Sequence, residues 1–124
     1  MSHNLFGFNL NKFELISCYD GDTCNFNILD DNFPTYLNPM LIRVYGVDTP
    51  EMKGKNTNKE LAIKAKNFTT NFVKNATNLQ LIDCIKDKYF RFNCTYISGK
   101  LSLADQLIKE KLGKPYFGGN KKEL

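Results

Sequence analysis

The sequence predicts a small α+β domain that is mainly β, and three observations support this fold class. Apolar and polar residues alternate with a period of two in the first third of the chain and again near residues 80 and 95, which is typical of strands. The period changes to that of a helix near residue 65 and again near residue 105. The chain has 124 residues, 42% of them hydrophobic and 24% charged, as in one globular domain. We therefore expect a single domain over residues 12–124 after a loose arm at residues 1–11.

Five strands follow from the alternation of apolar side chains. We expect them at residues 13–19, 24–29, 40–47, 79–85 and 90–96. In the last strand, Phe90 is expected on the same face as Phe92 and Cys94. Asp20-Gly21 and a polar loop over residues 30–39 contain the residue types that favour turns.

Two helices are expected, the first over residues 58–76. Thr57-x-x-Glu60 has the spacing of a capping box. The apolar residues that follow are spaced by three and four, namely Leu61, Ala65, Phe68, Phe72 and Ala76. The second helix opens at Ser102 and is ended by Gly113 and Pro115. Three strands, a helix, two strands and a helix form the plan of the OB-fold, a five-stranded Greek-key barrel that often binds nucleic acid.

The charge and cysteine patterns restrict the class of protein. The net charge is +4, which fits an anionic partner. The four cysteines, Cys18, Cys24, Cys84 and Cys94, lack the spacing of a zinc site. We interpret them as small buried residues, because a disulfide framework is not expected in a reducing compartment. The N-terminus has no signal-peptide pattern, and no run approaches the roughly 20 apolar residues of a membrane helix. We therefore expect an intracellular protein with no membrane association.

Three polar clusters are candidates for chemistry. The first, Asp20-Gly21-Asp22, offers the hard oxygen ligands that suit Ca²⁺ or Mg²⁺, although an ordinary hairpin turn has the same sequence. The second runs from Arg43, inside an apolar strand, to Asp48 and Glu51. A buried guanidinium needs an anionic partner, either a ligand or the neighbouring aspartate.

The third cluster is Asp87-Lys88-Tyr89-Phe90-Arg91. A lysine beside an aromatic residue suits a nucleotide by charge and by stacking, and a solvated turn is the alternative. Arg43 and Arg91 are the only arginines in a lysine-rich chain, and arginine grips phosphate with two parallel bonds. Together the clusters supply two aspartates that can bind a cation, a glutamate that can act as a general base and two arginines that can bind phosphate. Metal-assisted phosphodiester hydrolysis requires all of these groups.

The three clusters, in this order, resemble the staphylococcal nuclease-like (thermonuclease) domain, over about residues 15–121. The resemblance implies an OB-fold barrel and a Ca²⁺-dependent endonuclease that hydrolyses DNA and RNA and leaves 3′-phosphates. Mg²⁺ is an alternative, because hard oxygen ligands accept both ions. The expected partner is single-stranded or locally opened nucleic acid, bound by a monomer. We expect the third helix of the type member to be absent.

The resemblance also implies a metal site. Carried over position by position, Asp22 and Asp48 bind the metal through their carboxylates. Thr49 adds its backbone carbonyl, and the Asp20 carboxylate lies outside the direct ligands and acts on the metal through a bound water.

The remaining roles concern the substrate. By the resemblance, Glu51 is the general base that deprotonates the attacking water, while Arg43 holds the scissile phosphate and Arg91 stabilises the charge that develops on it. The residues implied in nucleotide binding are Lys88, Tyr89 and Tyr116. Phe90 departs from the family pattern, which usually has glycine there. The competing interpretation is a non-catalytic OB-fold module that binds nucleic acid or a protein.

Overall fold

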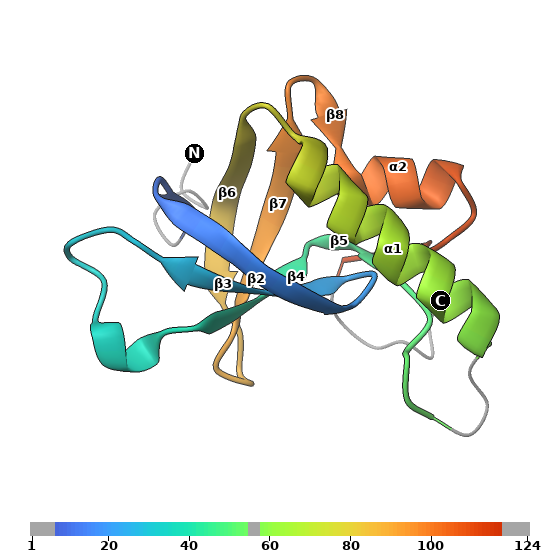
Figure 1. The fold of residues 1–124 in the computed structure, drawn as a ribbon, viewed down its shortest axis with the longest axis horizontal. Helices are drawn as coiled ribbons and strands as arrows, with labels where there is room; N and C mark the ends of the chain where they lie inside the picture. Colours follow the sequence, from blue (N-terminus) through green and yellow to red (C-terminus); the bar gives the residue numbers. More distant parts are fainter. Residues whose placement is uncertain (1–6, 55–57, 118–124) are drawn as a thin grey trace.

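A computed structural model describes residues 7–54 and 58–117 (Figure 1). Over these residues the chain forms a mainly β structure with two α-helices and a short 3₁₀ helix at Thr35–Leu37, so the α+β prediction is confirmed. The elements in chain order are β1 (Phe8–Leu10), β2 (Phe13–Asp20), β3 (Thr23–Ile28), β4 (Met40–Val44), β5 (Gly46–Asp48), α1 (Lys59–Asn75), β6 (Leu79–Lys86), β7 (Phe92–Ser98), β8 (Leu101–Ser102), α2 (Leu103–Lys109) and β9 (Lys114–Tyr116). Among the described residues, no helix has the length and apolar character that crossing a membrane requires.

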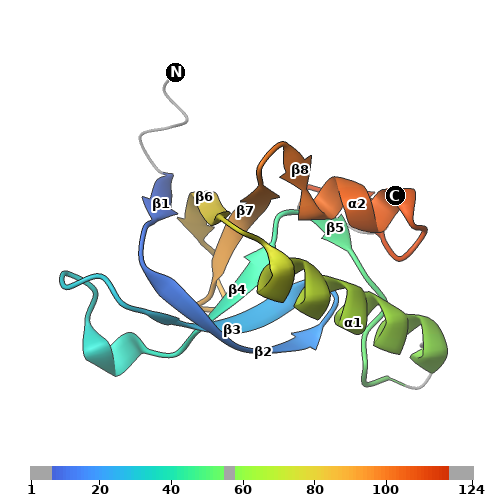
Figure 2. The same cartoon turned by 45° about the horizontal axis from the view of Figure 1, so that its top comes forward.

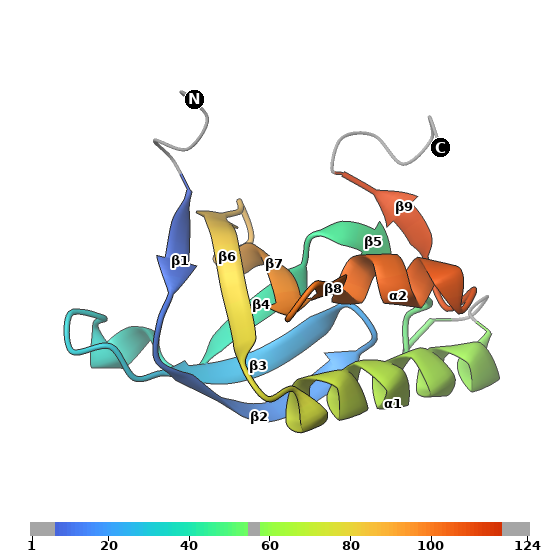
Figure 3. The same cartoon turned by 90° about the horizontal axis from the view of Figure 1, so that it is seen from above.

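The main sheet is open and mixed. Its hydrogen-bonded order is β1-β6-β7-β4-β3-β2, with β8 paired to β7, and β5 pairs separately with β9. Strand β4 runs parallel to β7, and the other pairs are antiparallel. Closure into a five-stranded barrel stays a prediction. Helix α1 lies along β2, and α2 packs against β5 and β7 (Figures 2 and 3).

The predicted third strand, at residues 40–47, is two strands in the structure. Gly46 has φ +99°, a conformation that glycine adopts without the steric cost of a Cβ atom. The chain therefore leaves the main sheet after Val44 and continues as β5, which pairs with β9. This bend separates Arg43, on the main sheet, from Asp48, at the end of β5.

Two other segments differ from the prediction. Phe8–Leu10 pair with β6, so part of the predicted loose arm belongs to the sheet (Figure 2). Phe90 was expected in the fifth strand, and this was wrong: it lies in the turn between β6 and β7, with φ +64° and 61% of its surface exposed. The backbone bonds from Phe90 to Asp87 and from Asp87 to Arg91 close this turn and override the alternation that continues through Phe90.

Helix α1 begins one residue later than the expected capping box implies. Asn58 is the N-cap, and its side chain accepts a hydrogen bond from the Leu61 amide at 3.0 Å; Thr57 lies outside the described residues. The buried residues of α1 are Ala62, Ala65, Thr69 and Val73. Larger residues such as Phe68 pack only at the edge of the core. The helix therefore turns its small side chains toward the sheet, which lets its backbone approach closely.

The second helix begins as predicted and ends earlier. The Ser102 hydroxyl accepts from the Asp105 amide at 3.3 Å. Lys111, with φ +61°, turns the chain after α2, and the Leu112 amide donates to the Leu107 carbonyl at 2.8 Å. Gly113 and Pro115 therefore follow the helix end rather than cause it.

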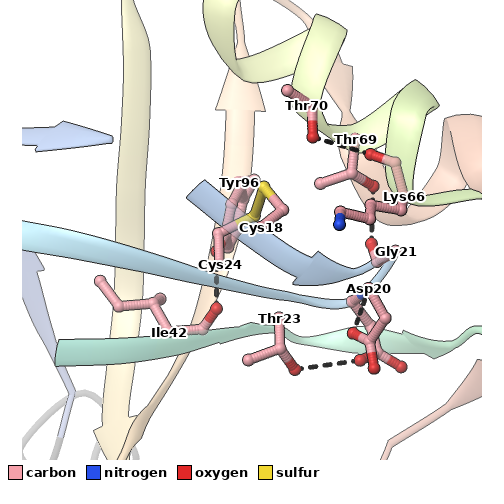
Figure 4. The surroundings of a disulfide bond; sticks show 11 residues. Cys18, Asp20, Gly21, Thr23, Cys24, Ile42, Lys66, Thr69, Thr70 and Tyr96 are labelled. Carbon is pink, nitrogen blue, oxygen red and sulfur yellow. Dashed lines mark hydrogen bonds between the residues drawn. A yellow bond between two sulfur atoms is a disulfide. The ribbon is translucent and has the colours of Figure 1, made fainter. Parts of the chain in front are cut away.

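The cysteines are buried, as expected, but the expectation that they are unpaired was wrong. Cys18 is bonded to Cys24 across β2 and β3, and Cys84 to Cys94 across β6 and β7. In both cases neighbouring antiparallel strands bring the two side chains to the inner face of the sheet. Figure 4 shows the first disulfide beside Tyr96, whose buried hydroxyl donates to the Ile42 carbonyl at 2.7 Å. Burial and the charge of Asp22 raise the pKa of this phenol well above its usual value.

Candidate active site

The turn between β2 and β3 carries two aspartates and is held against helix α1. A Cβ atom on Gly21 would lie 2.7 Å from the Ala65 Cβ and 2.9 Å from the Thr49 Oγ1. The buried Thr69 hydroxyl of α1 donates to the Gly21 carbonyl at 2.6 Å (Figure 4). Glycine is therefore required here by close approach, and the small buried face of α1 fixes the position of the turn.

Asp22 is a buried carboxylate with several partners, only 6% exposed. Its Oδ2 accepts from the Thr49 amide at 3.0 Å, and its Oδ1 accepts from the Thr23 hydroxyl at 3.0 Å. The Asp22 carbonyl accepts from the Val44 amide at 2.8 Å. These bonds join the β2–β3 turn to β4 and to the segment after β5.

Arg43 connects the carboxylates. Its Nη2 lies 3.5 Å from Asp22 Oδ2 and 3.4 Å from Asp48 Oδ1. Its guanidinium also lies over the ring of Tyr116, with Cζ 5.2 Å from the ring centroid. The sequence left open whether a ligand or an aspartate would balance this arginine, and in this structure two aspartates do so.

Asp20 has the most perturbed carboxyl of the site. Its pKa is raised from 3.8 to about 7, first because burial disfavours the charged form and second because the Asp22 carboxylate lies beside it. Arg43 acts in the opposite direction. A positive charge placed near this carboxyl would lower its pKa, because it would stabilise the ionised form.

These groups line one cavity of about 480 Å³, which we call the acidic cavity. Its lining includes six residues predicted from the sequence, namely Asp20, Asp22, Arg43, Asp48, Glu51 and Arg91. Tyr19, Met52 and Lys53 also line it. Lys53 was missed, because a lysine in a lysine-rich segment carries no signal of its own. The structure thus places carboxylates, the predicted base and both arginines around one space.

Arg91 is positioned by the turn between β6 and β7. Its Nε donates to Asp87 Oδ2 at 2.5 Å, and Asp87 Oδ1 accepts from the Tyr89 and Arg91 amides at 2.8 and 3.2 Å. Burial alone would raise the pKa of Asp87, but the hydrogen bonds from Arg91 and the two amides outweigh it and lower this pKa. Asp87 is therefore a fixed anion that organises the turn.

A second cavity, of about 700 Å³, adjoins the first and shares Arg43 and Arg91 with it. We call it the aromatic cavity. The predicted nucleotide-binding residues Lys88, Tyr89 and Tyr116 all line it. The other residues of its lining are Tyr45, Ile85, Asp87, Asn93 and Phe117. Tyr45 and Phe117 were not predicted as site residues, because Tyr45 lies in a predicted strand and Phe117 in the C-terminal tail. Only the fold brings the two rings together, with their centroids 5.7 Å apart.

Thr49 is the one predicted site residue outside both of these cavities. It is buried, it lines a smaller neighbouring cavity with Asp48, and its side-chain oxygen has no hydrogen-bond partner among the described residues. Within residues 7–54 and 58–117, no three His, Cys, Asp or Glu side chains form a group that could hold a metal ion. The metal-binding and catalytic roles carried over from the resemblance stay predictions.

Comparison with known families agrees with the motifs. The family model described as "Staphylococcal nuclease homologue" matches residues 41–123. This range contains both arginines, Glu51 and all the residues that line the aromatic cavity. Asp20 and Asp22 precede the range in sequence, and the fold places them in the acidic cavity beside its residues. No curated protein matches the chain.

Proposed function

Because the chain belongs to the family of staphylococcal nuclease homologues, we propose that it is a nuclease that hydrolyses phosphodiester bonds of DNA or RNA with the help of a divalent cation. The observation that carries this proposal is the acidic cavity. One space of about 480 Å³ is lined by three aspartates, a glutamate and both arginines of the chain. A site that only bound nucleic acid needs cations but no cluster of carboxylates.

The donor atoms of the site are carboxylate and carbonyl oxygens, which are the kind that a hard cation prefers. Asp22 and Asp48 would hold it with carboxylate oxygens, the Thr49 carbonyl would add a neutral oxygen, and Asp20 would act through water. The raised pKa of Asp20, caused first by burial and second by the Asp22 carboxylate, supports this assignment, because a bound cation would stabilise the charged form of this carboxyl. When bound, the ion supplies positive charge that stabilises the phosphorane-like transition state. Ca²⁺ and Mg²⁺ both match these ligands.

The side chains of the chain itself divide the remaining chemistry. Glu51 accepts a proton from the attacking water, and Arg43 and Arg91 donate hydrogen bonds to the phosphate oxygens. Asp87 holds Arg91 through Nε, which orients the guanidinium toward the cavity before substrate binds. In-line attack of the water oxygen on phosphorus breaks the P–O5′ bond. One fragment keeps a 3′-phosphate, and the leaving 5′-oxygen of the other takes up a proton from solvent water to become a hydroxyl.

The aromatic cavity supports a flexible, single-stranded substrate. A nucleotide whose phosphate contacts Arg43 or Arg91 can place its base in this cavity, because the two cavities share both arginines. The exposed ring of Tyr89 and the ring of Tyr116 offer stacking faces, and Lys88 offers charge for a neighbouring phosphate. Stacking of this kind requires a base that is free of its duplex partner.

The test of the metal assignment is cleavage of single-stranded DNA by the purified protein in Ca²⁺, in Mg²⁺ and in chelator. The informative variant is Asp48→Asn, which keeps the shape of the side chain and removes its charge. Asp31→Asn is the matched control, because Asp31 is exposed in the β3–β4 loop and lines neither cavity. We expect cleavage that needs the metal, survives in Asp31→Asn and is lost in Asp48→Asn. Cleavage by the wild-type protein in chelator would refute the metal assignment.

A non-catalytic binding module is the second candidate function. It is favoured by the ion pairs of Arg43 with Asp22 and Asp48, since these carboxylates already have a cationic partner. Binding of single-stranded DNA without cleavage in either metal, by protein that unfolds cooperatively, would favour this candidate over the nuclease.

A further inference from the structure

The aromatic cavity contains a polar group that none of the proposed catalytic steps uses. Asn93 is the second residue of β7, in register with Arg43 on β4 and with Ile85 on β6. Its neighbours Phe92 and Cys94 point into the core, so the Asn93 side chain is on the opposite face, where it lines the cavity. An asparagine here is flanked by a cation on one side and an apolar residue on the other.

The carboxamide oxygen of Asn93 is not satisfied by any group in the described part of the chain. This oxygen, Oδ1, is closed off from solvent and has no hydrogen-bond donor among the described residues. A buried acceptor without a partner is costly, and native structures contain few of them. The terminal torsion of asparagine is broad, so rotation of the carboxamide can present its oxygen and its amino group to the cavity. The unpaired oxygen is therefore suited to a ligand that brings a donor, and the amino group beside it can donate to an acceptor on the same ligand.

The rest of the lining indicates what kind of ligand this is. Tyr45 and Phe117 form a tilted aromatic pair, and both are exposed. These rings favour a flat aromatic group by stacking. Arg43 and Arg91, at the border with the acidic cavity, favour a phosphate attached to that group. A planar base with a phosphate nearby and an edge that pairs with a carboxamide meets all three conditions.

We propose that Asn93 recognises the base of the bound nucleotide and makes this cavity prefer adenine. The carboxamide oxygen accepts from the N6 amino group of adenine, and the carboxamide amino group donates to N7, which is the pairing that asparagine makes with this base. This proposal rests on the proposed function, because it assumes that the aromatic cavity holds the base of the substrate. Asn93 acts here as a specificity-determining residue and takes no part in bond cleavage.

Binding is measured first, in chelator, so that no hydrolysis can occur. The probes are the 5′-phosphorylated tetranucleotides (dA)₄, (dC)₄ and (dT)₄. A bidentate contact to a base corresponds to about 5- to 150-fold discrimination. We expect the wild-type protein to bind (dA)₄ at least about fivefold more tightly than (dC)₄ and (dT)₄.

Three variants separate recognition from structure. Asn93→Leu removes both polar groups, and Asn93→Asp keeps the size and removes the donor. Both are expected to reduce the adenine preference to less than about twofold, because neither side chain can form the bidentate pair. Thr95→Val is the matched control, since Thr95 lies on the same face of β7 but outside the cavity, and it is expected to keep the full preference.

The outcomes distinguish this proposal from the proposed nuclease. Adenine preference that persists in both Asn93 variants, or equal binding of all three tetranucleotides by the wild-type protein, overturns the role of Asn93. Adenine preference that is lost in these variants, with no cleavage in either metal, supports the role of Asn93 and overturns only the hydrolysis. Metal-dependent cleavage with equal binding of the three probes overturns only the base recognition.

Discussion

Replacing Gly21 by alanine is expected to destabilise the protein by about 2–4 kcal/mol. The new Cβ would lie 2.7 Å from the Ala65 Cβ, 2.9 Å from the Thr49 Oγ1 and 3.0 Å from the Thr49 Cβ. Ordinary contacts between such atoms are about 3.5–4.0 Å, so either α1 or the segment at Thr49 must move by several tenths of an ångström. Neither neighbour is the flexible end of a long side chain, and the strain cannot be relieved by a change of rotamer alone.

The magnitude follows from two terms. Overpacking of a filled core costs about 1–3 kcal/mol. Movement of α1 away from the turn also weakens the hydrogen bond from the Thr69 hydroxyl to the Gly21 carbonyl, now 2.6 Å long, which is worth about 1 kcal/mol. For a domain of this size, 1 kcal/mol corresponds to about 4 °C in Tm, so a decrease of roughly 8–16 °C is expected.

The assay is thermal and urea denaturation of the protein in chelator, combined with a compensating substitution. Ala65→Gly removes the atom that the new Cβ contacts at 2.7 Å, although it costs about 1 kcal/mol in helix propensity. The double variant is therefore expected to be less destabilised than the sum of the two single variants, by about 1 kcal/mol or more. Additive effects, or a Gly21→Ala protein as stable as the wild type, would refute the argument that α1 holds this turn by close packing.

The remaining predictions concern the β6–β7 turn, the disulfides and the acidic cavity. Phe90→Gly should raise the free energy of unfolding, measured by urea denaturation, by about 0.5–1 kcal/mol. Phe90 has φ +64°, and glycine avoids the roughly 1–2 kcal/mol cost of that conformation, although it loses more backbone entropy on folding. A variant less stable than the wild type would contradict this. Reduction of the disulfides should lower the free energy of unfolding measured in guanidinium chloride, by about 2 kcal/mol for Cys18–Cys24 and about 3 kcal/mol for Cys84–Cys94. These values follow from sequence separations of 6 and 10, because a longer closed loop constrains the unfolded chain more. Equal stability with and without reductant would show that the pairs do not form. The raised pKa of Asp20 means that the folded protein retains a proton that the unfolded chain releases between about pH 4 and pH 7. In chelator, Asp20 should therefore make the protein less stable as the pH rises through this range, and the difference in Tm between the wild type and Asp20→Asn should change with pH; parallel curves would contradict the raised pKa.

Local patterns were sufficient for most of the fold. Strands β2, β3 and β6 and helix α1 occur within a residue or two of their predicted positions, because each buries one face of an alternating or helical pattern. The errors occur where one backbone conformation decides the path. Gly46 bends the chain out of the sheet, and Phe90 adopts a left-handed conformation in the turn. In both places the apolar alternation continues through the bend, so the pattern alone cannot locate it.

The candidate site was predictable as a set of residues but not as a geometry. Asp22, Asp48 and Arg43 stand out in the sequence because charged residues in or beside apolar strands need partners. Their mutual contacts at 3.4–3.5 Å depend on the pairing of β3 with β4 and on the bend before β5. The raised pKa of Asp20 results from burial under the surrounding segments. Asn93 carries no sequence signal, because an asparagine in an asparagine-rich chain becomes notable only when its carboxamide lacks a partner.

The most direct test of the central claim compares cleavage and binding in one variant, Glu51→Gln, with Glu14→Gln as the matched control on the exposed side of β2. Single-turnover cleavage of single-stranded DNA and the Kd for the same oligonucleotide are measured on the same samples, cleavage in the active metal and binding in chelator. If Glu51 is the general base, Glu51→Gln slows cleavage by about 10²- to 10⁴-fold, with a Kd within about twofold of the wild-type value, because proton transfer contributes only to the transition state. Cleavage by Glu51→Gln at the rate of the Glu14→Gln control would contradict the account.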